Sequence, residues 1–309
     1  MELFLAQLPQ QLVNGLTLGA VYALIALGYS MVYGILQLLN FAHGDVYMVG
    51  AFVGFGVMTA LLPQAGPLAP VWLILLLMIV MAMLGCGVLG VGIEWFAYRP
   101  LRNSPRLAAL ISALGVSFFL QNAVQLTLGA RFRAYRTDAL IPATIGWDIG
   151  SARLSAVRLL VITVAVLLMV ALTYLVQRTR LGRAMRAVAL DREAAAMTGV
   201  DVDQVIVATF FIGSALAGAA GVLTGVVFTR IWHFMGFNAG LKGFTAAVVG
   251  GIGSLPGAML GGFLLGLVEA FATGYISSTY KDVIAFIVLV VVLLVRPGGI
   301  AGVKMQQKV

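Results

Sequence analysis

Long apolar runs separated by short polar stretches make up most of the chain. The runs lie at residues 12–36, 46–62, 71–97, 107–129, 157–177, 203–229, 240–273 and 282–296. A helix needs roughly 20 consecutive apolar residues to cross the hydrocarbon core of a bilayer. The pattern therefore predicts an all-α polytopic membrane protein, a bundle of roughly eight transmembrane helices. We interpret residues 1–309 as one membrane domain, because the polar stretches do not have the composition of interdomain linkers.

Two features of the pattern predict interrupted helices. The run 240–273 is longer than one span needs at a rise of 1.5 Å per residue, which indicates a short or re-entrant helix before a true span. Residues 14–60 and 205–252 resemble each other, since each contains a Gly-bearing helix, a polar break and a second short helix. Interrupted segments at corresponding positions point to a transport path. Gly-rich apolar helices look alike in many membrane proteins, so the sequence leaves a true repeat and a chance likeness both open.

The composition excludes a water-soluble protein, because hydrophobic residues make up 61% and charged residues 10% of the chain. The net charge of +8 bears on topology and not on nucleic acid, since the arginines lie in short loops between apolar runs. Basic residues at 99–106 and 178–192 are separated by two spans and therefore share a side, which the positive-inside rule makes cytoplasmic. The basic stretch 131–158 then lies outside. The side of the N-terminus stays open.

The longest charged, helix-forming stretch between the apolar runs is the segment at about 180–200. We expect this segment to be cytoplasmic and to be bound by a soluble partner. Asp191 is placed to cap a short helix, Glu193 lies in its first turn, and Gly199 supplies a left-handed stop. The residues that we expect to couple the chain to that partner are Arg183, Arg186, Asp191, Glu193, Ala194, Ala195 and Gly199.

The chain carries no pattern that predicts catalysis. It contains no G-x-x-x-x-G-K-[ST] motif, so any ATP hydrolysis belongs to another polypeptide. The Gly-rich run 250–257 lacks the following Lys and Ser or Thr of a phosphate-binding loop. His43, His233 and Cys86 form no nucleophile–base pair or metal cluster. We therefore predict a protein that is not an enzyme, with no catalytic residue and no metal or cofactor of its own.

Five polar residues within apolar surroundings are candidates for a translocation path: Asn40, His43, Asp45, Lys242 and Glu269. Asp45 can simply cap a helix that starts at Val46. Alternatively His43 and Asp45 lie on the path, where a positive helix end and a carboxylate meet the two ends of a zwitterion. Lys242 and Glu269 are costly in hydrocarbon, so they are either functional or a structural ion pair. The sequence does not choose between these alternatives.

Small residues predict a close helix contact in the second half of the chain. Gly213, Ala217, Gly221 and Gly225 recur every four residues. Such spacing lets two helix backbones approach where lipid provides no hydrophobic drive. We expect this seam to face another helix.

Four segments carry a specific resemblance. They are residues 14–26 (NGLTLGAVYALIA), 40–45 (NFAHGD), 97–102 (AYRPLR) and 243–259 (GFTAAVVGGIGSLPGAM). Together they resemble the LivH-type permeases of high-affinity branched-chain amino acid ABC importers, and the likeness extends from about residue 11 to 300. The spacing E-A-A-x-x-x-G, from Glu193 to Gly199, is similar to the coupling-helix signature by which such permeases dock on their ATPases.

The resemblance implies a multi-pass permease subunit of the bacterial inner membrane that takes up Leu, Ile or Val. Its implied partners are a second homologous permease, two cytoplasmic ATPases that bind ATP and Mg, an external substrate-binding protein and the lipid bilayer, with no nucleic acid. Relatives in the same family carry urea, short amides or other amino acids, so these substrates remain alternatives.

Two functions of another class also fit part of the pattern. An ion-coupled secondary amino acid transporter would have broken helices, but it usually needs intramembrane charges, and the runs 12–36 and 203–229 contain none after Asp203. A purely structural membrane subunit agrees with the composition. Uptake that depends on ATP and on a binding protein separates the importer from both.

Overall fold

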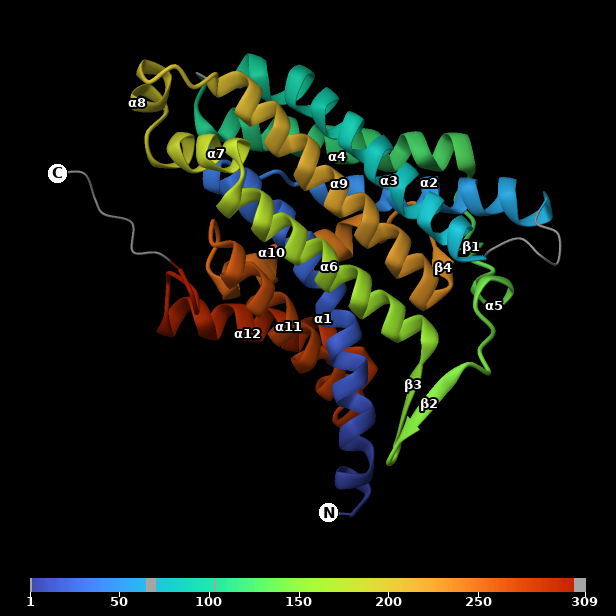
Figure 1. Ribbon diagram of the computed structural model, residues 1–309. Coiled ribbons are helices and arrows are strands. Elements are labelled where there is room, and N and C mark those ends of the chain that lie inside the picture. The colour runs from blue at the N-terminus through green and yellow to red at the C-terminus, as the bar shows by residue number, and fades with distance from the viewer. Residues whose placement is uncertain (1, 65–70, 103, 303–309) are drawn as a thin grey trace.

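The computed structural model describes residues 2–64, 71–102 and 104–302, which form a helical bundle (Figure 1). The long helices are α1 (Glu2–Leu36), α2 (His43–Leu61), α3 (Val71–Ile93), α4 (Arg106–Leu128), α6 (Ala156–Arg178), α9 (Val202–Phe228), α11 (Leu255–Tyr275) and α12 (Lys281–Val295). In this described part of the chain, 8 helical segments are long and apolar enough to cross a membrane. The predicted all-α polytopic bundle is confirmed.

Short helices and strands connect the spans. The helical ones are η1 (Leu62–Gln64), the π-helix η2 (Glu94–Tyr98), η3 (Arg99–Leu101), α5 (Thr137–Leu140), α7 (Arg180–Leu190), α8 (Arg192–Met197), α10 (Met235–Gly250) and η4 (Ser278–Tyr280). The strands pair antiparallel, β1 (Arg133–Ala134) with β4 (Arg230–Ile231) and β2 (Gly146–Ile149) with β3 (Ala152–Ser155).

The long apolar run at 240–273 divides into two helices. α10 ends at Gly250 and α11 begins at Leu255. Between them Gly251 and Gly253 have φ angles of 110° and 89°, a left-handed region that favours glycine. The predicted short helix before a true span is therefore present, and it begins at Met235.

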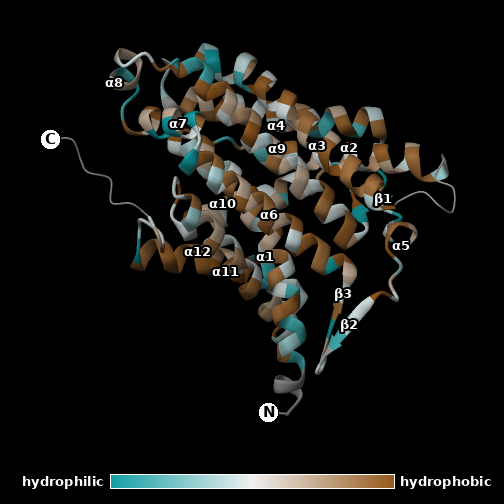
Figure 2. Cartoon of the chain, in the orientation of Figure 1, coloured by the Kyte–Doolittle hydropathy of each residue, from teal (hydrophilic) through white to brown (hydrophobic). Residues whose placement is uncertain are grey.

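The two ends of the bundle carry different basic segments. At one end Arg99 pairs with Asp203 at 3.1 Å, which places the turn after α3 beside the start of α9. At the other end the β2–β3 hairpin lies beside α1, where the Arg153 backbone N–H donates to Gln10 Oε1 at 2.8 Å. Figure 2 shows hydrophilic residues gathered at these two ends. The sequence predicts that two of the basic segments share one side of the membrane and that the third lies on the other side, and this arrangement agrees with that prediction. The N-terminal end of α1 lies opposite α8 (Figure 1).

Helices α1–α4 and α9–α12 repeat one arrangement in opposite directions. α1 packs against α11 as α9 packs against α3, and α2 packs against α3 and α4 as α10 packs against α11 and α12. α1 ends beside α8, where Arg192 Nη2 donates to the Ile35 carbonyl oxygen at 2.7 Å, whereas α9 begins after α8 and runs away from it. The likeness between residues 14–60 and 205–252 is therefore part of an inverted repeat of the kind found in transporters.

Each repeat contains a break after its first helix, at residues 37–42 and 229–234. The chain turns back into the bundle at the first break, because a Cβ placed on Gly28 would lie 2.3 Å from the His43 ring. Gly28 precedes the end of α1 at Leu36 by two turns, roughly 12 Å at 1.5 Å per residue. α2 therefore begins inside the bundle.

The predicted glycine seam of α9 is confirmed as a helix contact. A Cβ on Gly221 would lie 2.2 Å from the Tyr47 carbonyl oxygen of α2, and one on Gly225 would lie 2.5 Å from the Tyr135 ring. Gly213 lies against Gly28 of α1, and Ala217 is completely buried. The seam thus lets α1 and α2 approach the backbone of α9.

Candidate functional site

Local hydrogen bonds define the segment that the sequence predicts as the coupling helix. Thr179 Oγ1 accepts from the Gly182 N–H at 3.0 Å and caps α7. The Asp191 carboxylate accepts from the Glu193 and Ala194 N–H groups at 3.0 and 3.1 Å and caps α8.

α8 ends in a Schellman motif, in which Val200 N–H donates to the Ala195 carbonyl oxygen at 3.1 Å and Gly199 N–H donates to that of Ala196 at 3.0 Å. Gly199 has a φ of 85°, as a left-handed stop requires. The sequence places both the cap and the stop at the positions where the structure has them.

Two large apolar side chains are exposed on this segment. Leu190 is 86% and Met197 83% exposed, and Glu193 and Ala194 are exposed between them. Ala195 is buried, so it packs inward although the sequence groups it with the coupling residues. Leu190 and Met197 thus leave large apolar side chains exposed at the polar end of the bundle.

Arginines hold the segment to the spans. Arg192 reaches the end of α1, as described above, and Arg186 donates to the Val176 carbonyl oxygen of α6. Arg183 is exposed. Burial lowers the pKa of Arg192, and the charge of Arg102 lowers it further. An arginine guanidinium stays protonated in proteins, so Arg192 keeps its charge and its bond to α1.

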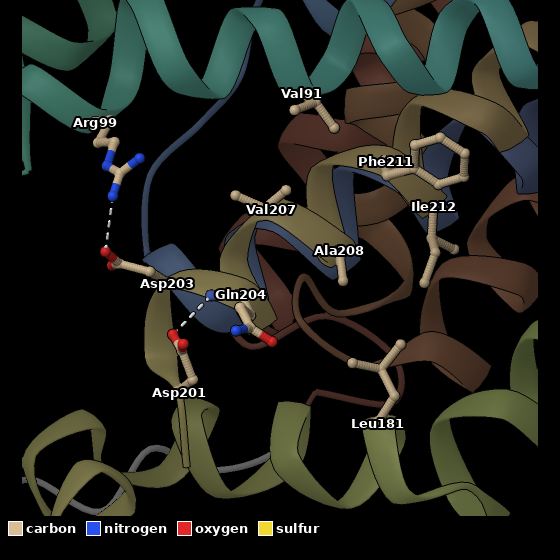
Figure 3. Close-up of a pocket in the computed structure, with 10 residues that line it drawn as sticks. All are labelled: Val91, Arg99, Leu181, Asp201, Asp203, Gln204, Val207, Ala208, Phe211 and Ile212. Atoms are coloured by element: carbon tan, nitrogen blue, oxygen red, sulfur yellow. Dashed lines mark hydrogen bonds and ion pairs between the residues drawn. The ribbon is translucent and has the colours of Figure 1, made fainter.

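An ion-pair network that sequence analysis missed ties the same end together. Arg102 bridges Glu94, which is fully buried, and Asp203 at the start of α9. Arg99 also pairs with Asp203, and Figure 3 shows this pair at the edge of a cavity of about 660 Å³. Asp201 and Gln204 also line it, and the apolar part of its lining comes from α3, α7 and α9: Val91, Leu181, Val207, Ala208, Phe211 and Ile212. The network thus joins the turn that follows α3 to the start of α9, and Leu181 of α7 lines the cavity beside it.

Asp45 does not cap α2, so that interpretation is wrong. α2 begins at His43, and its N-cap residue Ala42 makes no side-chain bond. Asp45 therefore lies in the first turn, and its carboxylate accepts from Ser117 Oγ and from Gln121 Nε2, the latter at 3.1 Å, on α4. The carboxylate links α2 to α4 inside the bundle.

Asn40 of the first break and His43 at the start of α2 are also buried. His43 stands edge-on to Tyr29, with 4.8 Å between ring centroids. Asn40 is 2% exposed. Within the described residues, Asn40 Oδ1 and His43 Nε2 have no hydrogen-bond partner. The break therefore keeps unsatisfied polar atoms at a depth where their burial is costly.

Lys242 and Glu269 form the ion pair that the sequence offers as one alternative. Lys242 Nζ lies 2.7 Å from Glu269 Oε1 and 2.7 Å from Asp282 Oδ1, and Tyr22 Oη donates to Glu269 Oε2 at 2.8 Å. Sequence analysis missed Asp282. The available signal was an acidic residue at the start of the final apolar run.

A cavity of about 490 Å³ adjoins this ion pair. It is lined from α1, α2, α9, α10, α11 and α12, with Tyr22, Tyr47, Lys242, Glu269 and Asp282 among its polar residues. It shares Leu18, Phe228 and Thr273 with a second cavity that reaches Gln11 near the hairpin end. Lys242 and Glu269 thus line an outer cavity, whereas the described lining residues do not include Asn40, His43 or Asp45.

Comparison with known proteins identifies the family. The profile described as "Branched-chain amino acid transport system / permease component" matches residues 11–293. The chain belongs to this family. It is 47% identical over 307 residues to the high-affinity branched-chain amino acid transport system permease protein LivH of Escherichia coli K12, covering 97% of both chains. It is 48% identical over 303 residues to the corresponding protein BraD of Pseudomonas aeruginosa, again covering 97% of both.

Family membership confirms the resemblance stated from the sequence. The permease is a multi-pass membrane protein and a member of a family of ABC transporter permease components. Among the described residues, no group of three or more His, Cys, Asp or Glu side chains could hold a metal ion.

Proposed function

We propose that this permease is the transmembrane subunit of an ATP-driven importer of branched-chain amino acids in the bacterial inner membrane. The observation that carries the proposal is the capped α7–α8 segment, which presents Leu190, Glu193 and Met197 outward at one end of the bundle of a family permease. Leu, Ile and Val are the proposed substrates because the relatives at 47% and 48% identity are named for their transport.

The α7–α8 segment is the proposed docking site for a cytoplasmic ATPase. Its hydrogen bonds to α1 and α6 would transmit a movement of the segment to these two spans. The Arg102 network extends this connection to α3 and α9. The permease itself binds no cofactor in this proposal, and ATP and Mg belong to two ATPase subunits.

A second homologous permease is proposed to complete the translocation path. α12 supports this, because the span that contains it is the least buried of the spans in the described chain, with 6% of it buried. The path is proposed to pass the first break, where Asn40, His43 and Asp45 lie beside the junction of α2 and α10. A broken backbone at this depth is tolerated where protein or water satisfies its polar groups.

The hairpin end, opposite α8, is proposed to face outside and to receive the substrate-binding protein. This orientation puts the basic segments 99–106 and 178–192 in the cytoplasm. It also puts the N-terminal end of α1 outside.

Reconstitution tests the proposal. The permease is co-purified with its neighbouring permease, ATPases and binding protein and placed in liposomes, and uptake of labelled leucine is measured with and without ATP. ATP-dependent uptake that also needs the binding protein supports the importer. Uptake that follows an ion gradient without ATP supports a secondary transporter instead. Competition by urea, short amides and other amino acids at equal concentration decides the substrate class.

A further inference from the structure

We propose that the outer cavity beside Lys242 is a transient binding site for a free zwitterionic amino acid, whose carboxylate pairs with Lys242 and whose ammonium pairs with Asp282. This inference rests on the proposed function, since it names the residues that take the amino acid after the binding protein releases it.

The two carboxylates that pair with Lys242 beside the cavity differ in their exposure to solvent. Glu269 is held by both Lys242 and the Tyr22 hydroxyl, and its side chain is 4% exposed. Asp282 shares the same ammonium, but its side chain is 53% exposed. One cation therefore serves two carboxylates, and Asp282 is the one that a solute in the cavity can reach.

A zwitterion can replace the Lys242–Asp282 contact with full charge compensation. Its carboxylate takes the place of Asp282 at Lys242, and its ammonium takes the place of Lys242 at Asp282. Glu269 keeps Lys242 and Tyr22 throughout. No charge is left unpaired in the exchange, which matters because an uncompensated charge in a partly dry site is strongly unfavourable.

The cavity walls suit an apolar side chain. Val21 of α1, Phe228 of α9, Trp232 of the second break and Met235 of α10 line it. Its volume of about 490 Å³ lies within the range of about 300–1,000 Å³ found for small-molecule sites. Apolar walls with a few polar groups that fix orientation are the usual construction of such sites.

The remaining charged lining residues favour the carboxylate end. Arg230 and Lys281 also line the cavity, so three basic residues face two acidic ones. Arg230 is partly engaged, since its guanidinium carbon lies 4.7 Å from the centre of the Phe132 ring. The surplus of positive charge attracts the carboxylate of the amino acid. Asp282 then pairs with the ammonium of the amino acid. Both ends of the solute are recognised.

Saturation-transfer NMR on the assembled importer in nanodiscs, without the binding protein, tests the site. Three probes are compared: leucine, 4-methylpentanoate, which has only the carboxylate, and isopentylamine, which has only the ammonium. We expect a saturation-transfer signal from leucine and a signal at least about tenfold weaker from each analogue, since each leaves one protein charge unpaired.

Two variants and a control complete the experiment. Asp282→Asn is expected to weaken the leucine signal about tenfold, whereas Asp148→Asn, an exposed carboxylate of the hairpin, is expected to leave it unchanged. Lys242→Met alone leaves Glu269 buried without its cation, so Lys242→Gln is made together with Glu269→Gln. That double variant is expected to lose the signal while the complex still assembles.

The outcomes separate this inference from the function on which it rests. Equal leucine signals from the wild type, Asp282→Asn and the double variant overturn the site. A wild type that takes up leucine in liposomes but gives no signal also overturns the site and leaves the proposed function standing. A wild type that shows neither uptake nor signal overturns both.

Discussion

Gly44 of α2 and Gly236 of α10 each occupy the space that the other's side chain would need. A Cβ on Gly44 would lie 2.4 Å from the Gly236 carbonyl oxygen, and a Cβ on Gly236 would lie 2.5 Å from the Gly44 carbonyl oxygen. Each is the second residue of its helix. The reciprocal contact therefore marks the point at which the two inverted repeats meet.

Gly44→Ala is expected to reduce the amount of folded permease severalfold. The added methyl group meets backbone, which cannot move aside as a side chain can, and overpacking of this kind costs about 1–3 kcal/mol or more. Size-exclusion chromatography of the tagged permease measures the effect. Gly56→Ala is the matched control in the same helix, because its Cβ meets nothing within 4 Å. Equal yields of the two variants would show that the junction is loose.

Gly199→Val is expected to uncouple ATP hydrolysis from uptake. A β-branched residue pays about 1–2 kcal/mol in the left-handed conformation, so the Schellman motif that ends α8 opens. Asn tolerates this conformation, so Gly199→Asn should keep most of the coupling. The ratio of leucine taken up to ATP hydrolysed, measured in liposomes, is the readout. An unchanged ratio in the Val variant contradicts the prediction.

Cysteine labelling maps the docking face. A cysteine at Ala194, which is exposed, should react with a membrane-impermeant maleimide from the cytoplasmic side and be protected when the ATPase is bound. A cysteine at Ala195 should react slowly in both states, because that position is buried. Labelling of the Ala194 site only from outside would reverse the proposed orientation.

Arg102→Met is expected to destabilise the permease by about 3–5 kcal/mol, because it leaves Glu94 buried without a cation. Glu94→Gln in the same chain removes the stranded charge and should restore much of the loss. Thermal unfolding in detergent, followed for the two single variants and the double variant, measures this coupling. Additive losses would show that the two side chains act independently.

Asp45→Asn is expected to lower transport while the complex still assembles. Asn keeps an oxygen that accepts from Ser117 or Gln121 but removes the negative charge beside the break. Asp45→Leu removes both acceptors and should lower the amount of permease as well. Uptake per assembled complex separates the two effects. Full transport by the Asn variant would remove Asp45 from the proposed path.

The features that the sequence predicts are those that neighbouring residues determine. Span positions follow from continuous apolar runs, and the ends of α8 follow from Asp191 and Gly199 because caps are local. The glycine seam follows from a spacing within one helix. These three features agree with the structure.

The features that the sequence does not predict depend on partners far along the chain. Asp45 accepts a hydrogen bond from Ser117 of α4, which lies 72 residues away in the chain. The residues next to Asp45 in the sequence suggest only a helix cap, because they do not reveal this distant partner. Lys242 and Glu269 can be paired by charge alone, but the third member, Asp282, comes from a helix whose packing no local pattern reveals. The inward direction of Ala195 likewise depends on how α8 rests against the spans.

The π-helical turn η2 sets the rotational phase of the residues that follow it. Arg99 N–H donates to the Glu94 carbonyl oxygen, a bond that spans one residue more than an α-helical bond. Glu94 and Tyr98 are buried and Trp95 and Phe96 are exposed. An α-helix rotates by about 100° per residue, so the extra residue shifts the direction of Arg99 and of the residues that follow it. Such a turn is what insertion of a single residue into an α-helix produces. A one-residue gap here in an alignment of relatives would therefore indicate that different side chains contact α9, and not only that the helix is one residue shorter.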